Sequence, residues 1–237
     1  IDLVSEALIL TAFDLGADGV ILWGCEESHH EQIESMVHFA QMALSAFNLG
    51  ERVLLMNHGQ GDAQDLATTV TNFVKRLSPS PLRKKKLVTV DFAKPKRDIL
   101  LEVIQDLYIK TKVHPQLKEE NTPFPFADIS INGRCTLCNA CVNLCPPKAL
   151  WKDANTLDFC YGRCIACGLC ERACPEDALK LRRVLDFSLL VEKGSKKLIE
   201  VELVACAACG KLFMPQSAFE RMTSLLKEGK GNGEFNI

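Results

Sequence analysis

The chain has 237 residues, of which 47% are hydrophobic, and its formal net charge is −2 at pH 7. This length allows one or two globular domains with a sizeable core. A nearly neutral charge balance excludes the overall basic field that recruits nucleic acid, so we expect no nucleic-acid partner. No apolar run reaches the roughly 18 residues needed to cross a bilayer, so we expect no membrane span.

The first part of the chain alternates between helical and strand-like patterns. Apolar residues at helical spacing predict a helix that ends at Gly16, and the nearly all-apolar run after it predicts a buried parallel strand. The expected elements, in order, are helix 2–15, strand 18–25, a helix through residue 47, strand 52–56, helix 62–77 and helix 98–110. This alternation predicts an α/β layer with a parallel sheet.

Three phrases in this region carry a resemblance to a known family. They are Ala12-Phe13-Asp14-Leu15-Gly16-Ala17-Asp18-Gly19-Val20, Gly24-Cys25 and Gly50-Glu51-Arg52-Val53. Residues 5–79 thereby resemble the delta subunit of methyl-viologen-reducing hydrogenases. Related domains feed electrons in heterodisulfide reductase and formate dehydrogenase complexes. The resemblance implies a flavodoxin-like α/β domain over residues 1–110 that docks a redox enzyme of this kind.

The same resemblance implies a [2Fe–2S] site, from which this chain departs. Family members use a cysteine after the strand, a second about five residues later, and others earlier. Here Cys25 is present, but His30 lies near the second ligand position, and no further cysteine occurs before Cys135. Because histidines replace two thiolates in Rieske-type centres, Cys25 with His29 or His30 is a candidate site. The alternative is a domain that has lost its cluster and serves as a docking surface.

A basic stretch and a proline-containing segment separate the two parts of the chain. The basic residues lie at 82–86 and 94–97, and no aromatic stacking platform accompanies them, so we interpret them as a solvated linker or a patch for an acidic partner. Residues 111–125 contain prolines and show no periodicity. We therefore expect a linker there.

The central stretch contains a cysteine motif twice. It reads C-T-L-C-N-A-C-V-N-L-C-P from Cys135, and C-I-A-C-G-L-C-E-R-A-C-P from Cys164. This is the bacterial ferredoxin pattern, in which three thiolates and the fourth cysteine of the other copy hold one [4Fe–4S] cluster. The expected ligand sets are Cys135, Cys138, Cys141 and Cys174 for one cluster, and Cys164, Cys167, Cys170 and Cys145 for the second. Zinc favours two separated pairs, so the uninterrupted triple argues against it.

The repeat extends beyond the ligands. Pro147-Lys148-Ala149-Leu150 matches Glu176-Asp177-Ala178-Leu179, with Ala and Leu in register. We expect a strand at 127–131, a hairpin over 150–159, and pairing of 178–181 with the first strand. These elements predict an α+β ferredoxin-like 2[4Fe–4S] module over residues 126–186. Cys160 is left over, either as a packed side chain, a spare thiol or a swapped ligand.

The last part of the chain, residues 187–237, is a tail with a second type of cysteine motif. The alternating pattern before this motif predicts a strand over 199–205. Cys206-Ala207-Ala208-Cys209-Gly210 resembles a zinc-ribbon or rubredoxin knuckle, in which Gly permits the tight turn below two thiolates. A knuckle needs a second pair, which we expect beyond Ile237. Cys206 and Cys209 then either share a metal, with zinc the expected ion, or stay empty. A thioredoxin-type dithiol is the rival, and Gly210 argues against it.

The compartment follows from the cysteines. Disulfides and cluster thiolates compete for the same sulfurs, so twelve cysteines in a cluster protein predict a reducing compartment, the cytoplasm. No signal-peptide pattern opens the chain. The chain starts at Ile1 rather than Met, so we expect it to be a fragment that lacks its natural start.

Together these patterns predict an electron-transfer subunit or domain without independent catalysis. Its partners would be subunits of a hydrogenase, a formate dehydrogenase or a heterodisulfide-reductase-like complex, because the chain itself shows no paired acid and base or activated nucleophile. Two alternatives belong to other classes. One is a flavin or [2Fe–2S] oxidoreductase with its site at Cys25, and the other is an iron–sulfur sensor or assembly protein.

Overall fold

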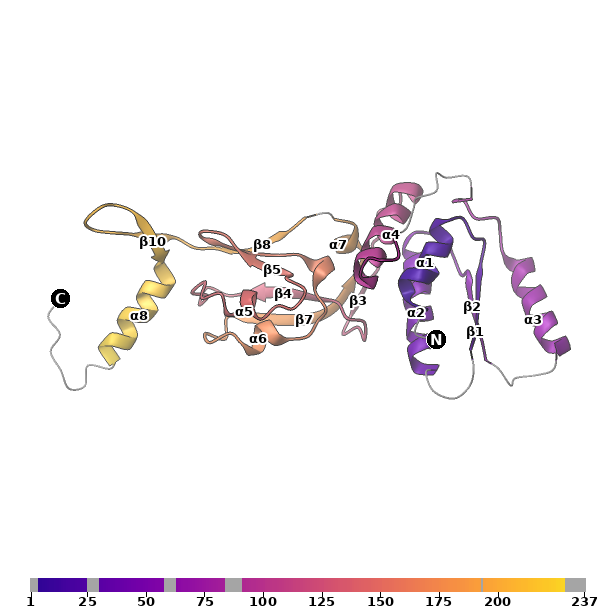
Figure 1. The fold of residues 1–237 in the computed structure, drawn as a ribbon, viewed down its shortest axis with the longest axis horizontal. Helices are drawn as coiled ribbons and strands as arrows, with labels where there is room; N and C mark the ends of the chain where they lie inside the picture. Colours follow the sequence, from indigo (N-terminus) through magenta and orange to yellow (C-terminus); the bar gives the residue numbers. More distant parts are fainter. Residues whose placement is uncertain (1–3, 25–29, 58–62, 84–90, 193, 229–237) are drawn as a thin grey trace. The chain divides into compact units, whose positions relative to one another are not determined.

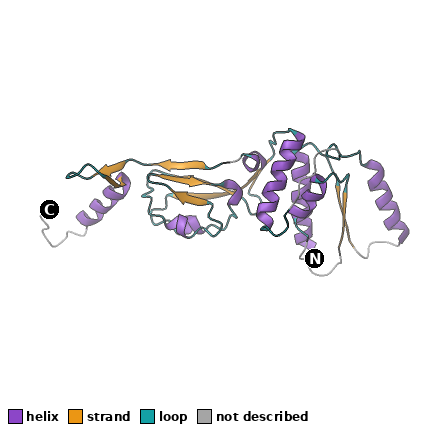
Figure 2. Cartoon of the chain, turned by 45° about the horizontal axis from the view of Figure 1, so that its top comes forward, coloured by secondary structure: helices purple, strands orange, loops and turns teal. Residues whose placement is uncertain are grey.

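The structure is a computed structural model, and it describes residues 4–24, 30–57, 63–83, 91–192 and 194–228. The chain divides into two compact units. Unit 1 comprises residues 1–118 and 186–192, and unit 2 comprises residues 119–185 and 193–237. Unit 1 is mainly helical, whereas unit 2 is mainly strands and loops (Figure 2).

Unit 1 confirms the predicted alternation of helices and strands. Its elements are α1 (Glu6–Asp14), β1 (Val20–Gly24), α2 (His30–Ala46), β2 (Val53–Asn57), α3 (Ala63–Arg76), α4 (Lys96–Thr111) and α7 (Phe187–Val191). Strands β1 and β2 pair in parallel, with Val20 opposite Val53. Helix α3 lies on the opposite side of this pair from α1 and α2 (Figure 1). Unit 1 is therefore a mixed α/β unit with a parallel sheet, which within the described residues contains these two strands.

Gly16 ends α1 as the sequence predicted. Its φ is +98°, and its N–H donates to the Phe13 carbonyl while the next N–H, of Ala17, donates to that of Ala12. This pair of bonds is a Schellman motif, which favours glycine at the left-handed position. A Cβ on Gly16 would lie 2.9 Å from the Cα of Arg83. Glycine is thus required both by the backbone angle and by the close approach of the chain.

Arg52 is a buried side chain that connects three loops of unit 1. Its guanidinium donates to the backbone carbonyls of Leu49, Asp18 and Ser78. The Asp18 carboxylate in turn accepts from the Ser80 N–H at 2.6 Å. These bonds tie the turn before β1 to the turn before β2 and to the segment after α3. Arg52 and Asp18, both within the phrases that carry the family resemblance, therefore have a structural role here.

A second polar contact of unit 1 is an ion pair between α1 and α4. The Lys110 Nζ lies 2.7 Å from Asp14 Oδ1 and also donates to the Asp14 carbonyl. The Asp14 side chain is fully buried, and the Lys110 side chain is 9% exposed. Burial raises the pKa of Asp14, and its bond to Lys110 opposes that shift. The other carboxylate oxygen, Oδ2, has no hydrogen-bond partner among the described residues.

Unit 2 contains the predicted hairpin and the predicted closing strand. The hairpin is β5 (Leu150–Lys152) with β6 (Thr156–Phe159), and β7 (Leu179–Asp186) pairs antiparallel with β4 (Ala127–Ile131). Ile129 lies opposite Leu181, so residues 179–181 pair with the first strand of the module. Two short helices, α5 (Ala140–Asn143) and α6 (Leu169–Arg172), and the 3₁₀ turn η1 (Tyr161–Arg163) complete it.

Several elements differ from the sequence expectation. The strand expected over 199–205 is divided into β8 (Lys196–Glu200), which pairs with β6, and β9 (Leu203–Ala205). The segment expected as a linker contains β3 (Lys118–Glu120), in the sheet β3-β7-β4. Strands β3 and β8 depend on partners distant in sequence, which local periodicity does not reveal. Strand β10 (Leu212–Pro215) and helix α8 (Gln216–Glu228) were not predicted.

The duplicated sequence produces duplicated backbone conformations. Five of the residues with positive φ belong to the two copies and are not glycine, and with Gly168 they form pairs separated by 29 residues. The pairs are Leu137 (50°) with Ala166 (54°), Asn139 (69°) with Gly168 (72°), and Lys148 (50°) with Asp177 (45°). Left-handed backbone is unfavourable for most side chains, so its recurrence at equivalent positions shows that the two loops have the same backbone conformation. In the part of the chain that the structure describes, no helix is long and apolar enough to cross a membrane.

Candidate iron–sulfur sites

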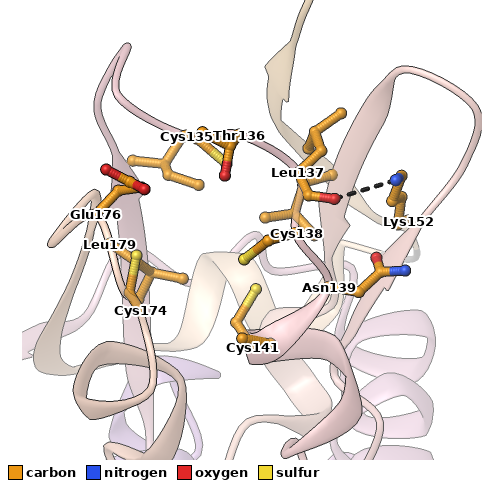
Figure 3. A pocket seen from close by; sticks show the side chains of 13 residues that line it. Cys135, Thr136, Leu137, Cys138, Asn139, Cys141, Lys152, Cys174, Glu176 and Leu179 are labelled. Carbon is orange, nitrogen blue, oxygen red and sulfur yellow. Dashed lines mark hydrogen bonds between the residues drawn. The ribbon is translucent and has the colours of Figure 1, made fainter. Parts of the chain in front are cut away.

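Four cysteines surround a cavity at one end of the β4–β7 sheet. They come from both copies of the motif: Cys135, Cys138, Cys141 and Cys174. Figure 3 shows the sulfur atoms of Cys138, Cys141 and Cys174 directed into one space, with Cys135 beside them. The loop after β4 supplies Cys135 and Cys138, helix α5 supplies Cys141, and the turn after α6 supplies Cys174. The structure therefore brings together the first set of cysteines expected from the sequence.

The second cavity contains the other four cysteines. They are Cys145, Cys164, Cys167 and Cys170. Helix α6 carries Cys170, and Cys145 follows α5, so each short helix sends its next cysteine to the other copy's cavity. Each four-residue helix ends two residues before this cysteine, and the chain then turns ahead of a proline. The turn places the cysteine at the cavity of the other copy. All eight cysteines are free thiols in the structure.

Backbone N–H groups point at sulfur atoms in both copies. The N–H of Ala149 donates to Cys145 Sγ at 3.2 Å, and that of Ala178 donates to Cys174 Sγ at the same distance. The Ala166 N–H lies 3.5 Å from Cys164 Sγ. Hydrogen bonds to sulfur stabilise thiolates and tune the potential of an iron–sulfur cluster. The left-handed residues described above thus shape loops whose amides face the sulfurs.

Three thiols in these cavities have raised pKa values. Burial, with a smaller contribution from neighbouring thiols, raises the pKa of Cys141 to about 11 and that of Cys170 to about 12. The pKa of Cys135 is raised for the same first reason. Metal ligands must be deprotonated, so such a site releases protons when a positively charged group binds.

The two cavities are neighbours. Helices α5 and α6, which carry Cys141 and Cys170, contact each other. The charge of Cys141 also contributes to the raised pKa of Cys170, although the two belong to different cavities. A group bound in one cavity would therefore lie beside a group bound in the other.

The donor set fits iron–sulfur clusters better than single ions. Four thiols and no carboxylate or imidazole form each ligand set, and soft thiolate ligands select zinc or iron–sulfur clusters. In the described part of the chain, no three His, Cys, Asp or Glu side chains converge as they would around one metal ion. The four ligands of a cubane bind four different iron atoms, so they are spread more widely than ligands that share one ion.

The remaining predicted residues fall into two groups. Cys25 and His29 lie outside the described residues, and nothing is described of the His30 side chain although its backbone begins α2. Cys160 is half-buried, and it lines neither cavity.

Cys206 and Cys209 lie in the turn between β9 and β10. The Gly210 N–H donates to the Cys206 carbonyl at 2.8 Å, and Gly210 has a φ of +69°. Hydrogen bonds from the Ala208 and Cys209 backbone, and from the Cys209 side chain, lower the pKa of the Cys206 thiol. The structure thus shows a hairpin turn that favours a thiolate.

Sequence reasoning missed the polar residues that line the first cavity. Lys152, Glu176, Asn139 and Thr136 all contribute to its wall. The repeat contained a signal for these residues. When the two copies are aligned with a shift of 29 residues, they differ in polarity at these positions.

Comparison with known families agrees with this geometry. The chain is an iron–sulfur protein: residues 132–153 and residues 161–180 each match a family described as a 4Fe-4S binding domain. Residues 1–79 match the family described as methyl-viologen-reducing hydrogenase, delta subunit. The chain therefore combines a domain similar to that delta subunit with two 4Fe–4S binding domains, as the sequence resemblance predicted. No curated protein matches the chain.

Proposed function

We propose that this chain relays single electrons through two [4Fe–4S] clusters between a redox enzyme and its electron carrier. The observation that carries the proposal is the pair of neighbouring four-thiol cavities. The ligands of the first cluster would be Cys135, Cys138, Cys141 and Cys174, and those of the second Cys164, Cys167, Cys170 and Cys145. Bound clusters would supply one-electron chemistry at each position.

The protein's own residues would position the clusters and limit their exposure. In each copy the first cysteine of the motif, Cys135 or Cys164, is buried, and the second, Cys138 or Cys167, is exposed. The exposed cysteine is where a partner's redox centre would approach most closely. The apolar residues of each wall would keep water away, and the N–H groups at sulfur would stabilise the thiolates.

The family match of residues 1–79 supports a partner from an oxidoreductase complex. We propose that a flavodoxin-like domain over residues 1–110 docks a hydrogenase, a formate dehydrogenase or a heterodisulfide-reductase-like subunit. A linker over 111–125, the 2[4Fe–4S] module over 126–186 and the tail over 187–237 would follow. We place the protein in the cytoplasm, since cluster thiolates persist where thiols stay reduced.

We also propose that the turn at Cys206 and Cys209 binds zinc together with ligands supplied from elsewhere. The lowered pKa of Cys206 supports this, because the thiolate is the form that binds metal. Zinc analysis of the wild type and of a Cys206→Ser/Cys209→Ser variant tests it. Equal zinc content in the two proteins would refute a site at this turn.

The main proposal is tested by iron and sulfide analysis of the anaerobically purified protein. Two cubanes require about eight irons and eight sulfides per chain, whereas about ten irons would indicate a further site such as Cys25. Reduction should then give paramagnetic signals that show mutual coupling, because the two cavities are neighbours. Four irons, or zinc in place of iron, would overturn the proposed relay.

A further inference from the structure

The two cavities are related by the repeat, but their walls are not equivalent. A shift of 29 residues relates the members of each pair, and in all four pairs below the polar member lines the first cavity. The pairs are Lys152 with Leu181, Glu176 with Pro147, Thr136 with Ile165, and Asn139 with Gly168. Leu181, Pro147 and Ile165 line the second cavity. Among the described residues that line the second cavity, none has a charged side chain.

Lys152 is the polar residue whose placement is most defined. It is the last residue of β5, is half-buried, and its Nζ donates to the Leu137 carbonyl at 3.0 Å. Figure 3 shows this bond between Lys152 and the carbonyl of Leu137, which lies in the loop between Cys135 and Cys138. Lys152 lines the same cavity as the four cysteines of the first site. An ammonium group is therefore held beside the ligand loop of the first site.

The other charges near the two sites do not cancel this difference. Glu176 also lines the first cavity, but Arg221 lies 3.4 Å from its carboxylate and offsets it. At the second site, the Arg172 guanidinium lies 3.4 Å from the Cys167 carbonyl, and the Arg183 guanidinium lies 3.5 Å from the Ala166 carbonyl. Arg172 and Arg183 are both exposed, and they line neither cavity. Solvent screens an exposed charge more than a half-buried one.

Reduction adds one negative charge to a cluster, so a nearby positive charge stabilises the reduced form. An apolar wall without a cation has the opposite effect, because it disfavours added charge. We propose that the site at Cys135, Cys138, Cys141 and Cys174 has the higher reduction potential of the two, and that Lys152 raises it. This inference rests on the proposed two-cluster function.

The consequence is a direction of electron transfer. An electron from the donor would first reduce the cluster at the second site. It would then pass to the cluster at the first site, which is reduced while the second-site cluster is reoxidised, and no bond forms or breaks. The external reductant would be a low-potential one-electron donor of the redox enzyme, acting at the Cys167 side. The acceptor would take the electron at the Cys138 side.

The experiment is a redox titration of the holo-protein, followed by electron paramagnetic resonance, for the wild type and matched variants. Lys152→Leu places at the first site the residue that the second site has, and Leu181→Lys makes the reciprocal change. Lys152→Gln keeps a donor for the Leu137 carbonyl without the charge, and Lys152→Arg restores the charge. Arg183→Met controls for an exposed cation. Iron and sulfide analysis accompanies every variant.

We expect two distinct potentials in the wild type. Lys152→Leu and Lys152→Gln should lower the higher potential and bring the two together, Lys152→Arg should keep the wild-type separation, and Arg183→Met should shift either potential less than Lys152→Leu does. If the Lys152 variants lower the lower potential, or if Arg183→Met acts equally, the inference is wrong. A wild type with two full clusters of equal potential also refutes it. Incomplete cluster content in the wild type would instead refute the proposed function itself.

Discussion

Long helices build unit 1, whereas very short ones carry ligands in unit 2. Helices α1 and α2 have 9 and 17 residues, but α5 and α6 have 4 residues each. A four-residue helix is not stable by itself, because nucleation costs more than so few hydrogen bonds return. Unit 1 buries phenylalanine and leucine side chains among its helices, whereas unit 2, which buries Phe126, Phe159 and Leu150, also contains two thiol-lined cavities. The comparison predicts that the stability of unit 2 depends more than that of unit 1 on what its cysteines bind.

Removal of a cluster ligand should have the largest effect, and it should affect the two units differently. In a Cys170→Ala variant, backbone amides of residues 127–185 should lose protection from hydrogen exchange by about a hundredfold or more, since metal-binding free energy is also folding free energy. Peptides that cover α1 and α2 should keep their protection. Hydrogen-exchange mass spectrometry of the purified holo-proteins measures both.

Cys160→Ala is the matched control for that experiment. Cys160 lies in the same module and is half-buried, but it lines neither cavity. Its replacement should leave protection of residues 127–185 nearly unchanged. Equal losses in Cys160→Ala and Cys170→Ala, or full protection in Cys170→Ala, would contradict the dependence of unit 2 on its clusters.

Unit 1 should be most sensitive to loss of its buried cation. Lys110→Met leaves the Asp14 carboxylate buried without a partner, and breaking such a pair destabilises by about 3–5 kcal/mol. Burial already raises the pKa of Asp14, and removal of Lys110 removes the bond that opposes this rise. Asp106 adds a further unfavourable charge. Hydrogen exchange of α1 and α4 peptides measures the loss.

The pH dependence of that variant gives a second test. A carboxyl group whose pKa is raised by folding favours the folded state below its unfolded pKa, and this contribution is lost as the pH rises through the folded pKa. The defect of Lys110→Met should therefore be largest at about pH 7 and smaller at about pH 5. A defect that does not change with pH would show that Lys110 acts through packing of its methylene groups rather than through its charge.

The sequence predicted the elements that depend on local patterns, and it missed those that depend on contacts between distant residues. The repeated cysteine pattern predicted the two groups of four that line the two cavities, while their role as cluster ligands stays a prediction. Periodicity was enough for α1, β1, α2, β2 and α3, whose patterns are local. The short helix α7 was not predicted, because its place in unit 1 rests on contacts distant in sequence. Its Phe187 ring lies 5.7 Å from that of Phe39, and Gln105 donates to the Leu190 carbonyl.

The candidate site shows the same limit at the level of single residues. Lys152 belongs to no sequence motif. Its role depends on the position of strand β5, which brings its ammonium group to the Leu137 carbonyl. The repeat shows that Lys152 and Leu181 are equivalent positions, but it does not show that both line a cavity. That fact required the paired strands β5–β6 and β4–β7.

The smallest expected effect separates backbone angle from close packing in unit 1. Gly16 and Gly50 both have left-handed backbone, with φ of +98° and +77°. A Cβ at Gly50 meets nothing within 4 Å, whereas at Gly16 it would lie 2.9 Å from the Arg83 Cα. Gly50→Ala should therefore cost only the left-handed penalty of about 1–2 kcal/mol, and Gly16→Ala should cost more. Protection of α1 amides in the two variants measures the difference, and equal losses would show that the chain near Arg83 moves aside freely.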